Sequence, residues 1–377
     1  MDNMFNFEPN ITDESQFNLD YLPETLKFRE NHQRELAHSI VSHVNYLLYG
    51  LPGTGKTLIA KYIRDAYIRD KNPDATFLYA SCLVDNTPKK LYTALLYQFN
   101  THIPSRATEG DLLKILQKSC PNTNNTYIIL DEIDRLDSFS DVLKILSDVF
   151  PRVGLILITN DLLWPSQLSQ EVKGRVGWLS TFFDSYTPLE LTTILKQRAE
   201  KGLREGCWNE GILNYISAKV KSKGRGDARV AIGVLERSAR LAEKEEGVIT
   251  DGIVDSAFAR YEADQILQTL STLPDYAKAI YMSLYKSDDN HLTAGELYAL
   301  YSEFVGTYMR PDVPISYTTY WKAINELSWS NLIATKDSRG KGGRGQTRDI
   351  YRLSPREAFK FIEPALSIQL RLSGGNQ

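Results

Sequence analysis

Short apolar runs alternate with amphipathic segments along the first half of the chain. The runs VNYLLYG, TFLYAS, YIILDE and LILITN begin at residues 44, 76, 127 and 155, and each has the length of a buried strand. Between them, LIAKYIRDAYIRD and the segments 88–99, 110–119 and 141–150 place apolar residues at helical spacing. This alternation predicts a parallel sheet that is covered by helices on both faces.

The strand pattern ends near Tyr186. Three helical segments follow, which read PLELTTILKQRAEKG, NEGILNYISAKVKSK and DARVAIGVLERSARLAEKEE, and a further helix begins at Thr250 and runs to about Leu267. From Leu270, three helical segments precede the short strands LIATKD and RDIYRLS, which flank SRGKGGRGQT. That order is typical of a winged helix. We therefore expect an N-terminal tail (1–20), an α/β base (21–185), a helical lid (186–265), a winged-helix domain (266–366) and a second tail (367–377).

Composition narrows the class of protein. A chain of 377 residues is long for one core, and 42% hydrophobic with 24% charged residues is globular usage that excludes disorder, collagen-like repeats and coiled-coil rods as the main theme. The apolar runs fall short of the ~18 residues that a membrane span needs, and the acidic N-terminus does not resemble a secretory signal. We expect a cytoplasmic protein without a membrane partner. The three cysteines, Cys82, Cys120 and Cys207, predict neither a disulfide framework nor a metal knuckle.

Residues 50–57 read GLPGTGKT and lie between a predicted strand and a predicted helix, the setting that the motif G-x-x-x-x-G-K-[ST] requires. Glycines allow consecutive N–H groups to surround phosphate at a helix N-terminus. We expect Lys56 to reach the β- and γ-phosphates and the Thr57 hydroxyl to coordinate Mg²⁺. The alternative is an ordinary glycine-rich turn before a lysine. The residues expected to contact the nucleotide here are Gly50, Pro52, Gly53, Thr54, Gly55, Lys56, Thr57 and Leu58.

Polar residues also end the third and fourth predicted strands. Because side chains alternate along a strand, Asp131 and Glu132 should differ in role, with Asp131 on the metal and Glu132 polarising a water for attack on the γ-phosphate. The strand ending at Asn160 reaches the same edge of a parallel sheet, where this amide could orient the water. A solvated acidic turn and an Asn-Asp turn opener are the alternatives.

With these motifs in order, the chain resembles the archaeal origin-recognition and helicase-loader family of AAA+ ATPases, over about residues 20 to 365. The resemblance implies an AAA+ α/β base with a helical lid and a C-terminal winged helix. It also implies nucleotide contacts from Tyr21-Leu22-Pro23, which precedes Arg29-Glu30, and from Tyr186, Arg198 and the sensor-two Arg229 of Gly226-Asp227-Ala228-Arg229. Winged-helix matches are Leu273-Pro274 and Gly343-Arg344-Gly345.

The sequence departs from the family pattern at two places. Ser185 stands where the family has proline before Tyr186, and Gln170-Glu171-Val172 stands where it often has Pro-Arg-Val. Arg175 is then the remaining candidate for an arginine finger that acts in trans. The alternative is that Arg175 is an ordinary salt-bridge partner.

The net charge is only −3, so a nucleic-acid surface must be local. Residues 336–348 carry five basic residues against one acidic residue, interspersed with glycines, as a wing that contacts DNA phosphates would. The predicted recognition helix opens with hydroxyl groups instead of arginines, so we expect modest base readout and a larger contribution from DNA shape. A solvated loop is the alternative. The residues expected to contact DNA are Tyr317, Thr318, Thr319, Lys322, Arg339, Lys341, Arg344 and Arg348.

Together, the motifs and the resemblance predict an ATP-dependent DNA-binding protein of replication initiation. ATP/ADP with Mg²⁺ would act as a switch, hydrolysis would be slow, and the protein would be a cytoplasmic, nucleoid-associated weak ATPase. Expected partners are the double-stranded DNA of a replication origin, sibling initiators and the replicative helicase. Two alternatives remain: an AAA+ ring motor such as a branch-migration helicase, and a signalling ATPase whose winged helix binds protein.

Overall fold

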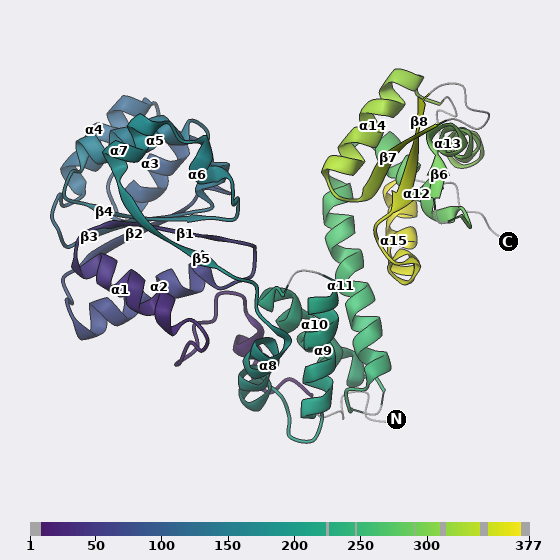
Figure 1. Ribbon diagram of the computed structural model, residues 1–377, viewed down its shortest axis with the longest axis horizontal. Helices are drawn as coiled ribbons and strands as arrows, with labels where there is room; N and C mark the ends of the chain where they lie inside the picture. Colours follow the sequence, from purple (N-terminus) through teal and green to yellow (C-terminus); the bar gives the residue numbers. More distant parts are fainter. Residues whose placement is uncertain are drawn as a thin grey trace. The chain divides into compact units, whose positions relative to one another are not determined.

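The computed structural model describes residues 9–223, 226–245, 247–289, 291–309, 314–339 and 346–370, which form two compact units that meet in sequence at Val248 and Ile249 (Figure 1). We expected this boundary at residues 265/266. Helix α11 (Asp251–Ser271) instead runs unbroken across that position. Its residues Ala263, Ile266 and Leu270, in the second half of the helix, are buried in the core of the C-terminal unit.

The N-terminal unit is built on a five-stranded parallel sheet with the strand order β2-β3-β4-β1-β5. The two strands β3 and β4 are buried along their whole length. The sequence predicted four of these strands and missed β5, because this edge strand leaves Leu179 and Phe182 exposed and lacks a continuous apolar run. The strands are β1 (Asn45–Gly50), β2 (Thr76–Ser81), β3 (Thr126–Asp131), β4 (Gly154–Thr159) and β5 (Trp178–Phe183).

Helices cover both faces of this sheet, as predicted (Figure 1). One face packs against α1 (Glu30–Val41) and α2 (Lys56–Asp70), whose apolar side chains join those of β1, β3 and β4. The opposite face is covered by α3 (Pro88–Tyr97), α4 (Glu109–Ser119), α5 (Phe139–Val149), α6 (Trp164–Gln167) and α7 (Gln170–Val176). The short 3₁₀ helix η2 (Ile133–Arg135) follows β3.

The lid consists of α8 (Pro188–Gly202), α9 (Glu210–Ser222) and α10 (Ala228–Ala242). We expected residues 1–20 to be a tail, but the described part of that segment packs on the lid. The amide of Thr12 donates to the carbonyl of Gly202 at 2.9 Å, and Asn10 is fully buried with its side-chain amide on the carbonyl of Ala239 at 3.1 Å. Helix η1 (Glu14–Phe17) follows and buries Phe17. These contacts make the segment part of the lid.

After α11, the C-terminal unit continues with helix, strand, helix, helix, strand and strand, an order that is typical of a winged helix, and it ends with a further helix. Its antiparallel sheet has the order β6-β8-β7. The sequence missed the three-residue strand β6 and the final helix α15, whose residues were partly placed in a tail. The elements after α11 are α12 (Asp275–Lys286), β6 (His291–Thr293), α13 (Ala294–Tyr308), α14 (Tyr317–Trp329), β7 (Ile333–Arg339), β8 (Gln346–Arg352) and α15 (Arg356–Gln369).

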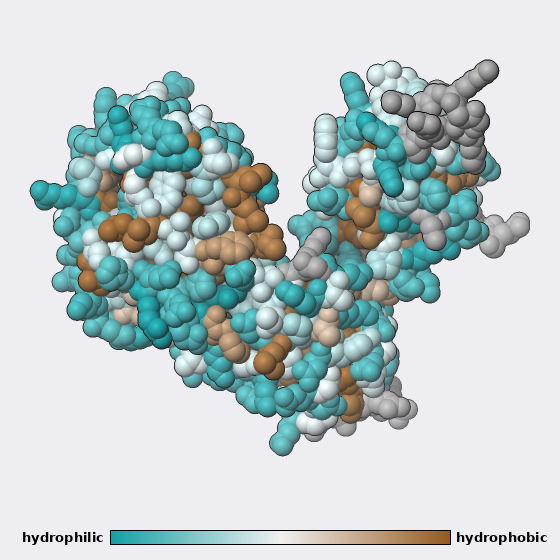
Figure 2. Space-filling model, viewed as in Figure 1, coloured by the Kyte–Doolittle hydropathy of each residue, from teal (hydrophilic) through white to brown (hydrophobic). Residues whose placement is uncertain are grey.

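Within the part of the chain that the structure describes, no helix combines the length and apolar character needed to cross a membrane. On the face shown in Figure 2, hydrophilic residues dominate and apolar residues gather in limited patches. Each unit therefore buries most of its large apolar side chains in its own core.

Candidate functional site: a phosphate loop beneath a helical lid

The loop that joins β1 to α2 has the backbone form of an anion-binding turn. Gly53 and Gly55 have φ angles of +71° and +94°, in the left-handed region that favours glycine. Gly55 is the residue directly before α2, so the first N–H groups of that helix, which have no partner within the helix, open toward the loop. The positive helix end and these N–H groups together can hold a phosphate.

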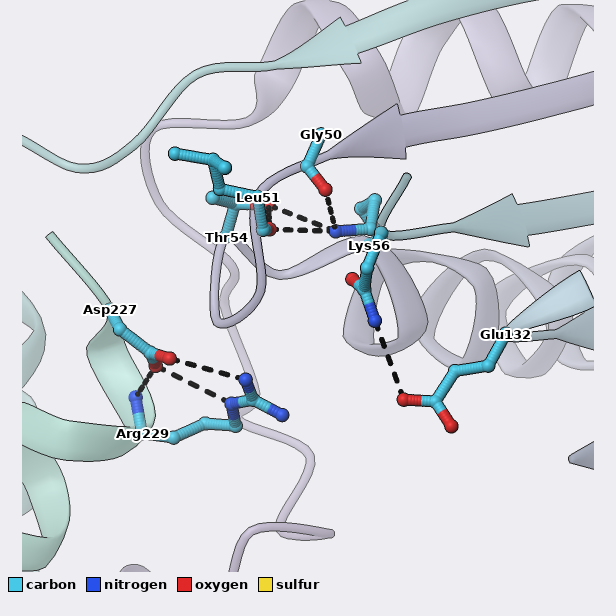
Figure 3. Close-up of polar contacts among 8 residues, drawn as sticks. Gly50, Leu51, Thr54, Lys56, Glu132, Asp227 and Arg229 are labelled. Atoms are coloured by element: carbon cyan, nitrogen blue, oxygen red, sulfur yellow. Dashed lines mark hydrogen bonds and ion pairs between the residues drawn. The ribbon is translucent and has the colours of Figure 1, made fainter. Parts of the chain in front are cut away.

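Lys56, the first residue of α2, is only 4% exposed. Its Nζ donates to the carbonyl oxygens of Gly50 at 2.8 Å and Leu51 at 2.7 Å (Figure 3). Burial lowers the pKa of Lys56 to about 8, although the nearby Asp131 carboxylate opposes that shift. A buried ammonium without a formal counter-ion in direct contact is costly, and an added anion would reduce that cost.

Thr57 and Asp131 bring a hydroxyl and a carboxylate together beside this loop. The Thr57 hydroxyl donates to Oδ2 of Asp131 at 2.7 Å, and the Tyr79 hydroxyl donates to the same oxygen at 3.0 Å. Asp131 is 5% exposed. Oxygen donors of these two kinds are what Mg²⁺ takes alongside phosphate oxygens, so the residues fit the predicted metal site.

Glu132 follows in the left-handed conformation, with a φ angle of +53°, which turns its side chain away from that of Asp131. The Asn160 amide donates to Oε1 of Glu132 at 3.4 Å, and Asp134 accepts from the Thr159 hydroxyl at 2.8 Å. Burial raises the pKa of Glu132, and the carboxylates of Asp131 and Asp134 raise it further. A carboxylate with a raised pKa beside an amide is suited to accept a proton from a water.

The lid lies directly on the phosphate loop. The amide of Ala228 donates to the carbonyl of Gly53 at 3.2 Å. Asp227 caps α10 by accepting from the amide of Arg229 at 2.8 Å, and its carboxylate also accepts from the Arg229 guanidinium at 3.1 Å (Figure 3). Arg229, which the resemblance predicts as the sensor-two arginine, is therefore held beside the loop by its neighbour Asp227.

A cavity of about 390 Å³ lies between the loop and the lid. This volume is within the usual range for a small-molecule site. Gly50 and Pro52 belong to the loop but do not line the cavity, and Gly50 contributes its carbonyl to Lys56. The predicted residues that line the cavity are Tyr21, Pro23, Gly53, Thr54, Gly55, Lys56, Thr57, Leu58, Asp131, Glu132, Asn160, Tyr186, Arg198 and Arg229.

Cations stack on both cavity tyrosines. The Arg29 guanidinium lies 4.1 Å from the centre of the Tyr186 ring and donates to the carbonyl of Thr54 at 3.2 Å. The Arg198 guanidinium lies 4.3 Å from the centre of the Tyr21 ring and donates to the carbonyl of Gln16 at 3.0 Å. These contacts fix the two tyrosine rings at the wall of the cavity.

Arg175 is not brought into this cavity. It lies on α7, where its guanidinium pairs with Asp148 at 2.6 Å and Glu171 at 3.7 Å. This is the geometry of the salt-bridge alternative. Action in trans on another subunit stays a prediction.

The predicted DNA-contacting residues fall in three groups. In α14, Tyr317 and Thr318 of the first turn and Lys322 of the second turn are exposed, and the Ser316 hydroxyl caps the helix by accepting from the amide of Thr319 at 3.3 Å. Arg348 on β8 is bonded to side chains of β7 and α14. Lys341 and Arg344, and the side chain of Arg339, lie outside the described residues.

Arg348 links the hairpin to α14. Its guanidinium donates to Asp337 of β7 at 2.9 Å and to Asn325 of α14 at 3.2 Å, and it lies 5.3 Å from the centre of the Trp321 ring. These bonds leave Arg348 fewer donors for a phosphate than a solvated arginine has.

Sequence reasoning missed several side chains at the site. No sequence motif includes Tyr79, which donates to Asp131, or Asp134, which accepts from Thr159. The same is true of Gln197, which lines the cavity. Asp227 was noticed only as part of the sensor-two motif, and its contact with Gly53 was not foreseen. The missed signal was the helical spacing of Ile194, Gln197 and Lys201, which could have indicated one face of α8.

Two family models match the chain: an AAA domain over residues 42–161 and a Cdc6 AAA+ ATPase-type lid domain over residues 192–259. The ORC1-type DNA replication protein 1 of Sulfolobus acidocaldarius is 29% identical over 350 residues, which cover 88% of this chain and 87% of that protein. The ORC1-type DNA replication protein 1 of Aeropyrum pernix is also 29% identical, over 92% of both chains.

Solved structures of archaeal ORC1 and Cdc6 proteins are also similar to this chain. The Aeropyrum pernix ORC1 protein, solved in complex with DNA, superposes with a TM-score of 0.79 at 27% identity and covers 95% of this chain and 97% of its own. Cdc6p from Pyrobaculum aerophilum has a TM-score of 0.59 at 23% identity over 96% of this chain and 100% of its own, and supports the fold. The α/β base with its helical lid is thereby confirmed, and the chain is similar over most of its length to archaeal ORC1/Cdc6 proteins of the AAA+ class.

Proposed function

We propose that the protein is an ATP-dependent DNA-binding protein of replication initiation, which recognises an origin, loads the helicase, or does both. The observation that carries the nucleotide part is the convergence of Lys56 from the base and Arg229 from the lid on one cavity. The relatives named as ORC1-type DNA replication proteins, and the relative solved with DNA, support the rest.

At the phosphates, Lys56 supplies a point charge and the first turn of α2 supplies backbone donors. Thr57 and Asp131 would hold Mg²⁺, which would neutralise phosphate charge there. Glu132 accepts a proton from the attacking water, and Asn160 orients that water and the carboxylate. Arg229 leaves Asp227 and places its guanidinium on the γ-phosphate. Hydrolysis is slow, since the nucleotide state is used as a switch between lid positions.

The winged-helix unit is the DNA-binding part in this proposal. The first two turns of α14 carry exposed hydroxyl groups and Lys322, and the segment 336–348 carries the basic residues. Origin DNA is the proposed partner, and sibling initiators and the replicative helicase are proposed to join it there.

A pair of binding measurements tests the nucleotide part. We expect Lys56→Ala to abolish ATP binding, because a methyl group cannot replace the charge on the β- and γ-phosphates. Lys71→Ala removes an exposed lysine at the other end of α2 and is the matched control. Equal ATP affinity in both variants would remove the phosphate-loop assignment.

A salt titration of duplex affinity tests the DNA part. Each lost phosphate contact should reduce the slope of log affinity against log salt by about one unit. Arg344→Ala is compared with wild type, and Lys360→Ala, which removes an exposed lysine of α15 outside the hairpin and α14, is the control. Identical slopes and affinities for all three proteins would favour the signalling ATPase whose winged helix binds protein.

A further inference from the structure

A short segment, residues 184–187, joins the α/β base to the lid, and we call it the hinge. Strand β5 ends at Phe183 and α8 begins at Pro188, and the residues between them belong to no helix or strand (Figure 1). The chain passes through the hinge from the sheet directly into the lid. The hinge backbone therefore sets where α8 starts relative to the sheet.

Arg29, the residue before α1, connects the hinge to the phosphate loop. Its Nη2 donates to the carbonyl of Asp184 in the hinge at 2.7 Å, and its Nε donates to the carbonyl of Thr54 in the loop at 3.2 Å. Its Nη1 donates to the carbonyl of Phe28 at 3.3 Å. Arg29 is only 5% exposed, and Thr54 is fully buried. One buried guanidinium thus joins the loop and the hinge.

Tyr186 of the hinge is packed against the same two segments. The Arg29 guanidinium lies 4.1 Å from the centre of its ring, which is within the range of a cation–π contact. A Cβ added to Gly55 of the loop would lie 2.8 Å from the Tyr186 hydroxyl oxygen. On the lid side, a Cβ added to Gly226 would lie 2.5 Å from the Tyr186 carbonyl oxygen. The hinge therefore has little room to move without the loop and the lid.

The partners of Arg29 suit a positioning role. Thr54 and Asp184 are far apart in the sequence, and both accept through backbone carbonyls, so the bonds fix the course of the chain. A planar guanidinium can hold several acceptors at once, whereas a lysine ammonium is a point charge. Hydrogen bonds from a charged donor are also stronger than neutral ones. Arg29 does not line the cavity, so any effect on a nucleotide passes through the loop.

We propose that Arg29 is a positioning residue that transmits occupancy of the phosphate loop to the hinge. The inference rests on the proposed nucleotide function and adds a route by which bound nucleotide acts on the lid. Phosphate bound by the loop amides restricts residues 53–57, and with them the Thr54 carbonyl. Arg29 passes this restriction to the Asp184 carbonyl, because one planar group is bonded to both. The hinge is then held more firmly when the loop is occupied.

Hydrogen exchange of the full-length protein, with and without ATP, tests the proposal. In wild type, ATP at about 100 times its Kd should slow exchange of the loop amides (53–57) and the hinge amides (184–187), by up to about a hundredfold where opening requires release of the nucleotide. In Arg29→Gln, also measured at about 100 times its own Kd, the loop should keep its response to ATP and the hinge should lose it. Arg34→Gln, which changes an exposed arginine of α1, is the matched control and should respond as wild type does.

The outcomes separate failure of this proposal from failure of the proposed function. A wild-type loop that does not respond to ATP overturns the nucleotide function. A wild-type loop that responds while the hinge does not, or a wild-type response of both segments in Arg29→Gln, overturns the role of Arg29 alone.

A purely structural Arg29 would change hinge exchange equally with and without ATP, and that result also overturns the proposal. If Arg29→Gln does not fold, Arg29→Lys carries the same expectation, because lysine keeps the charge and loses the planar arrangement of donors. Retention of the full hinge response in a folded Arg29→Lys would then refute the positioning role.

Discussion

Gly53 is the position where a single methyl group should separate the lid from the phosphate loop. A Cβ added to Gly53 would lie 1.7 Å from Oδ1 and 2.0 Å from Cγ of Asp227. The φ angle of Gly53, +71°, is also unfavourable for any residue with a Cβ. In Gly53→Ala, Asp227 must therefore move off the loop and carry Arg229 with it.

Three contributions set the expected loss of ATP affinity in Gly53→Ala. Holding alanine in the left-handed region costs about 1–2 kcal/mol. Losing Asp227 as the N-cap of α10 costs about 1 kcal/mol. The half-exposed ion pair between Asp227 and Arg229 adds at most about 1 kcal/mol after screening by solvent. A total of about 3 kcal/mol corresponds to roughly a hundredfold loss of ATP affinity if ATP needs the docked lid.

Calorimetric ATP titration of Gly53→Ala measures this loss. Gly174→Ala is the control, since nothing lies within 4 Å of a Cβ at Gly174 and the residue is helical. A double-mutant cycle adds a sharper test: in an Asp227→Ala background the atoms that clash are gone, so Gly53→Ala should cost only the backbone contribution. Wild-type affinity in Gly53→Ala, or an equal cost in both backgrounds, would refute the reasoning.

Three further perturbations have definite expected results. Burial lowers the pKa of Lys56 from 10.5 to about 8, so between these pH values the unfolded chain binds more protons than the folded protein. The free energy of unfolding of the protein should therefore rise by up to about 3 kcal/mol from pH 8 to 10.5. Denaturation of wild type and of Lys56→Met across this pH range measures the difference. Glu132→Gln should keep ATP and lose about 10²-fold or more in single-turnover hydrolysis, and an unchanged rate would assign the water to another residue. Asn10→Ala removes the side-chain bonds to Ala239 and Arg204 and should lower the free energy of unfolding by about 2–3 kcal/mol in urea titration, whereas a segment that merely trails from the lid would show no change.

The central sheet was predictable because its strands are buried. In β1, β3 and β4 nearly every side chain is apolar, and a parallel strand covered on both faces needs such a run. The edge strand β5 has only one neighbour, β1, and exposes Leu179 and Phe182, so its sequence does not carry the same signal. Burial on both faces, and not strand propensity, made the difference.

The site was predictable where chemistry depends on consecutive residues. The phosphate loop needs its glycines, Lys56 and Thr57 in one order, so the motif alone indicated the site. The contact of Asp227 with Gly53 joins residues far apart in the sequence and depends on how the lid packs. The same holds for the N-terminal segment, where Asn10 is buried by Ala239 of α10, and no local pattern reveals that.

The geometry of Arg229 gives the proposed switch a physical basis. A ligand can move an equilibrium between two lid positions only as far as its affinities for the two positions differ. In the structure, the Asp227 carboxylate accepts from Arg229, and the lid rests on the loop through Ala228 and Gly53. In the proposed switch, a γ-phosphate would compete with Asp227 for the same guanidinium, whereas ADP would offer no group at that point. ATP and ADP would then differ in whether a phosphate or Asp227 binds the Arg229 guanidinium. Because Arg229 lies in the first turn of α10, this change of partner would bear on the position of a lid helix.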